Sequence, residues 1–301
     1  MSTLSELFMF YNVENFFPAE NIKYEKSISG LYNWDDYKYG LKLRKIKNVF
    51  NWINEDFGQI PSIIGLAEIG GVSVLEDLQQ EDSLLRNHQF LYKKSNDSRG
   101  LSVALFYDEE KLKLKNFYSL SFSISENLVA DTRDILQAEF EFNNENLHIF
   151  ILHLPSQRLQ DEKKNLRNKI IEAFKNILSK IIEKQESIII MGDFNENPNG
   201  EKIKELLLDN FGNRIFINPF ENLFSNNQFS SYYGSKGLLF DQILYSKNLL
   251  EKLNFTSSYA SIFQNEKIRV KNSKHPLRTY SGSRYLSGFS DHFPVLLKLE
   301  K

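Results

Sequence analysis

The sequence predicts an α/β protein that forms one domain. Short apolar runs, rich in β-branched and aromatic residues, alternate with segments whose apolar residues recur at helical spacing. No repeat, low-complexity tract or linker rich in proline and glycine divides the 301 residues. The polar motifs described below come from both halves of the chain and have to meet to form a site, so we expect a single domain over residues 1–301.

Eight apolar runs have the length and composition of buried strands. They cover residues 7–11, 62–69, 102–107, 135–142, 147–154, 187–191, 240–245 and 295–299. The run at 135–142 alternates in part, with Gln137, Glu139 and Glu141 on one face. This alternation is typical of a strand that has one polar face.

Two longer segments have the helical period. The first stripe consists of Leu43, Ile46, Val49, Phe50 and Ile53, with Asp35 or Asp36 as the N-cap. The second consists of Leu166, Ile170, Phe174, Ile177, Leu178 and Ile181, opposite lysines and glutamates. A shorter helix is predicted over residues 201–208.

The composition excludes several classes of function. The hydrophobic content of 41% and the mean hydropathy of -0.41 are ordinary for a soluble globular protein. The net charge of -2 gives no global attraction to nucleic acid or to an anionic membrane, so a polyanion would need a local basic patch or a metal. Without cysteine, the chain can form no disulfide, thiolate metal site or cysteine nucleophile.

The sequence contains no recognisable targeting or membrane-spanning segment. Residues 1–6 run directly into a strand-like segment and lack the basic and apolar regions of a signal peptide. No apolar stretch is long enough to span a bilayer. We therefore expect a cytoplasmic protein without membrane insertion, and the sequence does not imply an oligomer.

Polar side chains recur at the ends of the predicted strands. They are Asn12 and Glu14 after the first strand, Glu68 near the end of the second, His153 at the end of the fifth, Asp193 and Asn195 beyond the sixth, Asp241 at the start of the seventh, and Asp291 and His292 before the last. Strand ends of layered α/β proteins converge on a cleft. Each residue alone also has a structural explanation, because an asparagine after a strand is usually a turn residue and a lone histidine is more often structural.

The combination favours metal-assisted phosphoester chemistry. Asp193 and Asn195 are two residues apart, so in extended chain both side chains point to one side and can hold a water and a phosphate oxygen. Asp291 and His292 are adjacent and point in opposite directions, toward a cation and toward substrate or an orienting carboxylate. Acids, amides and histidines, without a Ser-His-Asp order or a glycine-rich phosphate loop, suit a hard divalent ion such as Mg²⁺.

Eight short motifs occur in a specific order. They are YNVEN (11–15), LAE (66–68), DSRG (97–100), TRDIL (132–136), HLPS (153–156), GDFN (192–195), FDQI (240–243) and SDH (290–292). Over nearly the whole chain they resemble the endonuclease/exonuclease/phosphatase family, and the opening and closing segments are similar to a bacterial branch of it. The resemblance implies a four-layer α/β-sandwich, in which two mixed β-sheets lie face to face and helices flank them.

The resemblance also implies a metal site. Glu68 would be the main Mg²⁺ ligand, and Mn²⁺ could substitute for Mg²⁺. Asn12 and Asp291 would lie near the ion, and Glu14 would be available to a second ion.

The remaining motif residues would carry the chemistry of phosphoester hydrolysis. Asp193 would align or deprotonate the attacking water, while Asn195 and His292 would hold phosphate oxygens. Asp241 would orient His292. His153 would contact the phosphate and could protonate the leaving oxygen.

The sequence leaves the substrate open. A basic stretch before the last motif contains Lys267, Arg269, Lys271, Lys274, His275, Arg278 and Arg284, interleaved with Tyr280 and Tyr285. Such interleaving suits a phosphate-rich substrate, although a solvated loop would have the same composition. We predict substrate contacts from Lys274, Arg278 and Arg284, and from the motif residues Arg99 and Arg133.

Three functions are compatible with these features. The favoured one is a Mg²⁺-dependent phosphodiester hydrolase acting on nucleic acid, as an endonuclease or exonuclease. The alternative is a phosphatase or phosphodiesterase for a small phosphorylated metabolite, an inositol phosphate or a lipid headgroup, which the lack of global positive charge supports. A catalytically silent binding module is disfavoured, because none of the last three motifs is broken.

Overall fold

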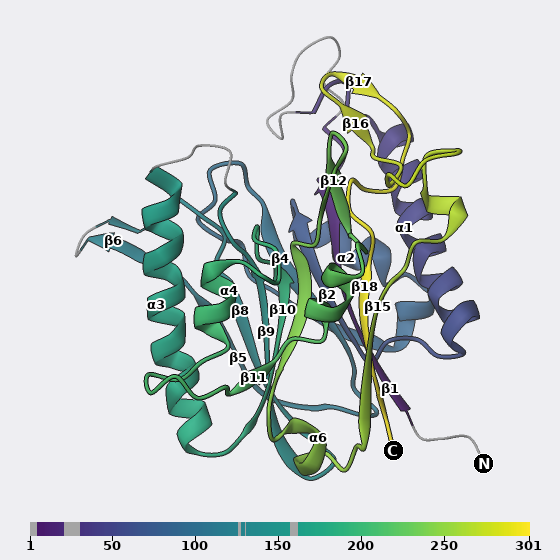
Figure 1. Ribbon diagram of the computed structural model, residues 1–301. Coiled ribbons are helices and arrows are strands. Elements are labelled where there is room, and N and C mark those ends of the chain that lie inside the picture. The colour runs from purple at the N-terminus through teal and green to yellow at the C-terminus, as the bar shows by residue number, and fades with distance from the viewer. Residues whose placement is uncertain (1–4, 21–30, 126–127, 130, 157–161) are drawn as a thin grey trace.

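A computed structural model describes residues 5–20, 31–125, 128–129, 131–156 and 162–301 (Figure 1). Two six-stranded mixed sheets pack face to face, and helices cover the outer face of each sheet. This arrangement is the predicted four-layer α/β-sandwich.

The first sheet has the strand order β15-β18-β1-β2-β4-β3. Its strands are β1 (Ser5–Phe16), β2 (Ile63–Ile69), β3 (His88–Tyr92), β4 (Ser102–Asp108), β15 (Ser257–Ile262) and β18 (Val295–Glu300). Only β1 and β2 are parallel among these neighbours, and their register sets Asn12 opposite Ala67. Asn12 in β1 is therefore level with the end of β2, where Glu68 directly follows Ala67.

The second sheet has the order β11-β14-β10-β9-β8-β5. Its strands are β5 (Lys113–Leu120), β8 (Ile135–Phe142), β9 (Glu145–His153), β10 (Ser187–Asp193), β11 (Phe216–Ile217) and β14 (Asp241–Ser246). Here β9 and β10 are the parallel pair. Asp193 lies opposite His153 on one side and opposite Asp241 on the other.

Helices form the two outer layers. Helices α1 (Asp36–Phe57) and α2 (Val72–Leu78) cover the first sheet, and α3 (Glu162–Glu183) and α4 (Glu201–Leu206) cover the second. The side chain of Asp35 accepts a hydrogen bond from Lys38 N at 2.9 Å and begins α1, which ends at Gly58 in the left-handed region (φ 69°). Among the described residues, no helix has the length and apolarity needed to cross a membrane.

Short elements complete the fold. They are the hairpins β6 (Ser123–Ser125) with β7 (Leu128–Val129), β12 (Ser231–Tyr233) with β13 (Lys236–Leu238) and β16 (Tyr280–Ser281) with β17 (Arg284–Tyr285), the helices α5 (Phe220–Ser225) and α6 (Leu249–Lys252), and the 3₁₀ turns Leu84–Asn87 and Glu266–Ile268. The β12–β13 and β16–β17 hairpins lie at the upper end of the sandwich in Figure 1, opposite the C-terminus.

Alternation of side chains along each central strand builds the layers. In β1, Leu7, Met9 and Tyr11 pack toward α1, whereas Phe8 and Phe10 pack between the sheets. Strand β10 divides its apolar residues in the same way between the α3 layer and the layer between the sheets. Central strands buried on both faces are continuous apolar runs in the sequence for this reason.

The eight predicted strands are the eight internal strands of the two sheets, and the three helices predicted correspond to α1, α3 and α4. The sequence pattern missed β3, β5, β11 and β15, which are the four edge strands. Edge strands are short or half-exposed, so they lack a long apolar run; β5, for example, is exposed along much of its length. The predicted helix over 201–208 ends at Leu206, and β10 extends to include Asp193.

Gly192 provides a test of the packing that positions the active-site strands. A Cβ atom at Gly192 would lie 2.2 Å from the backbone oxygen of Leu152, in the neighbouring parallel strand. Gly192→Ala should therefore lower the free energy of unfolding by roughly 1–3 kcal/mol through overpacking. Gly40→Ala is the control, because nothing lies within 4 Å of that position in α1. It should raise the free energy of unfolding by up to about 1 kcal/mol. Equal effects of both substitutions in urea denaturation would contradict this packing.

Candidate active site

The predicted site residues gather at one end of the sandwich. The parallel pairs β1–β2 and β9–β10 both finish at this end, and the antiparallel strands β14 and β18 begin there. Residues at strand ends and at strand starts are thus brought together, although they are far apart in the sequence. The six residues closest to the centre of the cluster are Asn12, Glu68, His153, Asp193, Asp241 and His292.

Asn12 connects the two sheets. Its buried Nδ2 donates to Glu68 Oε1 in the first sheet and to Asp193 Oδ2 in the second, at 3.2 Å each. Its Oδ1 accepts a hydrogen bond from Glu14 N at 3.1 Å. One amide side chain therefore fixes the spacing between two carboxylates of different sheets.

A bulge directs Glu68 into the site. The pairing of β2 with β4 shifts between Ala67 and Ile69, and Glu68 adopts a left-handed backbone (φ 68°). A bulge of this kind re-aims a side chain, and the left-handed region costs a non-glycine residue roughly 1 kcal/mol. Asn15 N donates to Glu68 Oε2 at 2.7 Å and holds the carboxylate in this orientation.

Asp193 is a buried carboxylate close to both histidines. Its Oδ2 lies 3.6 Å from His153 Nε2 and 4.0 Å from His292 Nε2, and its Oδ1 accepts a hydrogen bond from Asn195 N at 2.9 Å. Burial, and then the charge of Asp241, raise the pKa of Asp193 to about 7. The group can thus gain or lose a proton near neutral pH. Asn195 itself donates to the carbonyl of Leu154 at 2.8 Å.

His292 is held in its charged form by Asp241. The two side chains are 2.7 Å apart between Nδ1 and Oδ2, and Ser230 Oγ donates to the same carboxylate oxygen at 2.5 Å. Burial alone would lower the pKa of His292, but Asp241, together with Asp291 and Asp193, raises it well above the usual value. Both ring nitrogens of His292 are therefore donors at neutral pH.

The surroundings of His153 favour its neutral form, in contrast to those of His292. Burial, and then the positive charges of Arg133, Arg99 and His292, lower the pKa of His153 well below its usual value. Its Nε2 lies 4.0 Å from Glu68 Oε1, and its buried Nδ1 has no hydrogen-bond partner among the described residues. The site thus contains one neutral and one charged histidine.

Asp291 and Glu14 lie at the side of the cluster that faces Arg278. Arg278 Nη2 donates to Asp291 Oδ2 at 2.6 Å, and its Nε is 4.0 Å from Glu14 Oε1. The two oxygens of Glu14 also accept hydrogen bonds from the backbone N–H groups of Thr279 (2.6 Å) and Tyr280 (3.2 Å). Burial, followed by the charge of Asp291, raises the pKa of Glu14 to about 7. For Asp291, burial acts in the same direction, but His292 and Arg278 prevail and lower its pKa.

The basic residues predicted to bind substrate fall into two groups. Arg133 is buried, and its guanidinium donates to Asp97 Oδ2 (3.0 Å) and to the carbonyls of His153 (3.2 Å) and Leu154 (2.9 Å). It therefore supports the end of β9 from inside the protein. The exposed or half-exposed residues are Arg99, Lys274, Arg278 and Arg284.

Two residues of this region, Lys42 and Ser230, were missed by sequence reasoning. Lys42 is fully buried on the apolar stripe of α1, and its ammonium reaches the backbone behind the site. The signal was available in the sequence, because Lys42 is four residues before Ile46 on a face that is otherwise apolar. Ser230, which supports Asp241, gave no such signal.

A family model provides the decisive comparison. The model of the Endonuclease/Exonuclease/phosphatase family matches residues 7–301. The chain belongs to this family. Members of the Endonuclease/Exonuclease/phosphatase family are hydrolases that act on phosphoester bonds, so the predicted enzyme class is confirmed.

Solved structures share the fold at low sequence identity. A humanized D. rerio TDP2 carrying 14 mutations is 13% identical, with 99% of each chain covered and a TM-score of 0.62. A mannosyl-6-phosphatase of Bacteroides thetaiotaomicron VPI-5482 is 14% identical, covering 98% of this chain and all of the other, with a TM-score of 0.61. The human Nocturnin catalytic domain with a bound sulfate anion is 14% identical over 98% and 93% of the two chains, with a TM-score of 0.59. A comparison with curated protein sequences finds no match.

Members of the family typically depend on a divalent metal, and two groups of residues have suitable donors. Ligand atoms of Asp193, Asp241 and His292 lie within 4.8 Å of one another. In this group, however, Asp241 is hydrogen-bonded to His292 and Ser230, and a charged imidazole has no lone pair for a metal. Glu68 and Asp291 offer carboxylate oxygens and Asn12 offers an amide oxygen, which are the ligands that a hard cation prefers, and in this structure these oxygens accept hydrogen bonds from Asn15 N, Arg278 and Glu14 N.

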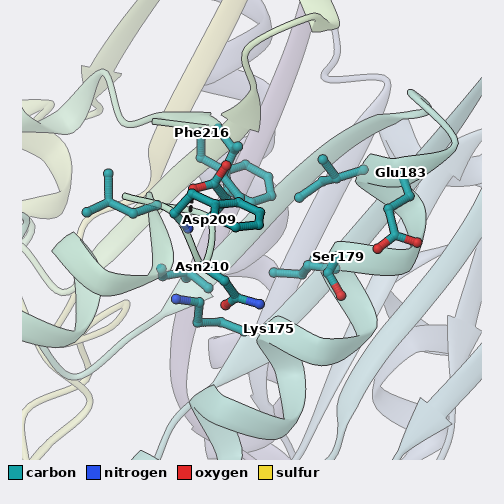
Figure 2. Close-up of a pocket in the computed structure, with 12 residues that line it drawn as sticks. Lys175, Ser179, Glu183, Asp209, Asn210 and Phe216 are labelled. Atoms are coloured by element: carbon teal, nitrogen blue, oxygen red, sulfur yellow. Dashed lines mark hydrogen bonds between the residues drawn. The ribbon is translucent and has the colours of Figure 1, made fainter. Parts of the chain in front are cut away.

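A separate pocket of about 190 Å³ lies between α3 and the segment that follows α4 (Figure 2). Its apolar lining includes Leu178, Ile182, Leu206 and Ile215, and Lys175, Asp209 and Asn210 are among its polar residues. None of the predicted catalytic or metal-binding residues lines this pocket. This pocket is therefore separate from the candidate active site.

The Asp241–His292 pair predicts a measurable dependence on pH. Asp241→Asn removes the carboxylate that keeps His292 charged, so the pKa of His292 should fall toward or below about 6.5. NMR titration of the histidine rings, with His292→Gln to assign the signal, measures this pKa. A pKa of His292 that stays as high as in the wild type would contradict the pairing.

The same pair also predicts a change in stability. A raised pKa in the folded state stabilises the protein fully below the unfolded-state value, near 6.5, and this contribution is lost as the pH rises through the folded-state pKa. Asp241→Asn should therefore lower the free energy of unfolding more at pH 6 than at a pH above the folded-state pKa. An equal loss at both pH values would contradict this linkage.

Proposed function

We propose that this chain is a Mg²⁺-dependent phosphodiester hydrolase, with Mn²⁺ as a substitute ion, and that it acts as one domain. The observation that supports this most directly is the bridge from Asn12 to Glu68 and Asp193. It brings a metal-binding carboxylate of one sheet next to a proton-accepting carboxylate of the other. Since each sheet supplies only part of this arrangement, neither half of the chain would be active alone.

The metal would be held by Glu68, with Asn12 and Asp291 nearby. When bound, it supplies positive charge that polarises a phosphoryl oxygen and offsets the negative charge of the transition state. Asp193, whose pKa is raised to about 7, aligns the attacking water and accepts its proton. Asn195, whose backbone N–H donates to Asp193, would contact the phosphate.

The two histidines have different proposed roles because their charges differ. His292, charged and oriented by Asp241, donates a hydrogen bond to a phosphate oxygen and stabilises its negative charge. His153 is neutral and contacts the phosphate as a hydrogen-bond donor, so protonation of the leaving oxygen by His153 is not favoured. Arg133 holds the backbone of His153 and acts as a positioning residue.

Nucleic acid is the proposed substrate. Exposed Lys274 and Arg284 lie in the segment that leads to Arg278 and the site, and the Lys274 ammonium stands 5.2 Å from the ring centre of Tyr232. Basic and aromatic side chains together are typical of surfaces that bind single-stranded nucleic acid. A fold relative, D. rerio TDP2, was solved with a single-strand DNA product, at 14% identity and a TM-score of 0.60.

A small phosphoester is the alternative substrate. The net charge of -2 supports it, as does the fold similarity to a mannosyl-6-phosphatase. In addition, the guanidinium of Arg278 is already paired with Asp291, which leaves less positive charge for a polyanion.

Removal of the proposed metal ligand tests the enzyme class. Glu68→Gln, or chelation with EDTA, should reduce cleavage of bis-p-nitrophenyl phosphate by about 10²-fold or more, as the loss of a main electrostatic stabiliser does. Glu76→Gln is the matched control, since Glu76 is exposed on α2, the helix that follows β2. It should retain full activity. Near-normal activity of Glu68→Gln that is also insensitive to EDTA would refute metal-dependent hydrolysis.

A charge-removal experiment tests the choice of substrate. Combining Lys274→Ala with Arg284→Ala should raise the KM for single-stranded DNA at nearly constant kcat, because binding contacts are lost and the chemistry is kept. The salt dependence of binding should become shallower by about one unit per lost phosphate contact. Lys113→Ala combined with Lys115→Ala, on the exposed edge strand β5, is the control. If KM and salt slope both stay at their wild-type values, the small phosphoester is favoured.

A further inference from the structure

Lys42 is a buried lysine that the proposed chemistry does not use. It lies on α1 among apolar residues and is 1% exposed. A buried ammonium is costly unless it is hydrogen-bonded and its charge is balanced. Its surroundings therefore show what this lysine does.

The ammonium of Lys42 has three oxygen acceptors, and the ring centre of Phe16 lies 6.0 Å away. It donates to Thr279 Oγ1 at 2.5 Å, to the backbone oxygen of Phe289, and to the backbone oxygen of Glu14 at 3.4 Å. These contacts account for its three protons. Thr279 and Phe289 lie near the two ends of segment 278–292, whereas Glu14 lies on β1. Lys42 therefore joins this segment to the strand that carries Asn12.

Other contacts reinforce the same junction. Ser290 Oγ donates to the backbone oxygen of Asn12 at 2.6 Å, and backbone N–H groups of the segment donate to the carboxylate of Glu14. The segment carries Asp291 and Arg278, whose side chains are paired at 2.6 Å. Arg278 therefore faces Glu14 and Asp291 directly, and Lys42 lies behind them, with burial lowering its pKa to about 8.

We propose that Lys42 is a positioning residue that holds segment 278–292, and with it Asp291 and His292, against β1. This inference rests on the proposed function. The three oxygens that accept hydrogen bonds from Lys42 come from both parts, so its loss would release the segment from β1 at this point. The carboxylate of Glu14 adds to the same junction, because it accepts hydrogen bonds from the backbone N–H groups of Thr279 and Tyr280.

Activity of the wild-type chain separates the two claims. If the wild type does not hydrolyse bis-p-nitrophenyl phosphate with Mg²⁺, the proposed function itself fails. If the wild type is active and Lys42→Met has the same kcat, only the role of Lys42 fails, so the two failures are distinguishable.

Substitution of Lys42 tests its positioning role. Lys42→Met should lower kcat by roughly 10²-fold, the effect of displacing catalytic groups by about 1 Å, while KM changes much less because Lys42 touches no substrate. Lys42→Arg, which keeps the charge, should restore part of the lost kcat. Lys47→Met is the matched control on the same helix, since Lys47 pairs with exposed Asp82 at 2.7 Å and should leave kcat unchanged. A wild-type kcat in Lys42→Met would overturn the proposal.

A double variant separates positioning from simple stability. Lys42→Met removes the positive charge near Glu14, whose pKa is raised to about 7, so the melting temperature should fall most well above pH 7, where Glu14 is ionised. Adding Glu14→Gln should recover much of this loss at that pH, because it removes the ionisable group. The kcat of the double variant should remain low, because the segment is still not tied to β1. Recovery of kcat together with the melting temperature would mean that Lys42 is only structural and would overturn the proposal.

Discussion

The hydrogen bonds of Asn12 across the two sheets are the contacts on which the active site depends. The sheets pack mainly through apolar side chains, which fix their separation but do not determine which polar groups meet. The buried amide of Asn12 does this, because its two N–H groups reach Glu68 in one sheet and Asp193 in the other. Every other proposed role assumes this spacing.

Burial and neighbouring charges divide the roles among similar side chains. Two histidines at one site differ in charge, because Asp241 raises the pKa of His292, whereas burial and then the charges of Arg133 and Arg99 lower the pKa of His153. The acids differ as well: the pKa of Asp193 is raised by burial, and that of Asp291 is lowered because His292 and Arg278 outweigh burial. Several acids in one place would repel a phosphate, and the positive charges of Lys42, Arg278 and His292 offset part of this repulsion.

Much of this structure could be predicted from the sequence. The features that could not be predicted are half-exposed edge strands and side chains whose partners lie far away in the chain. The internal strands are buried on both faces and were found as apolar runs, whereas edge strands such as β5 lack that pattern. The short motifs indicated which residues would meet. They did not indicate that Arg133 faces inward or that Glu14 binds backbone N–H groups, because both depend on partners far away in the chain. The apolar stripe of α1 likewise did not indicate that Lys42 is buried, because the oxygens that it contacts come from residues 279 and 289, far away in the chain.

A crystal structure with Mn²⁺, located by its anomalous scattering, tests the central claim most directly. The account predicts a peak at a carboxylate oxygen of Glu68, with Asp291 nearby and Lys42 still hydrogen-bonded to Thr279. It also predicts that Asp241 stays paired with His292 when the ion is bound. A peak among Asp193, Asp241 and His292, or none at Glu68, would contradict the account.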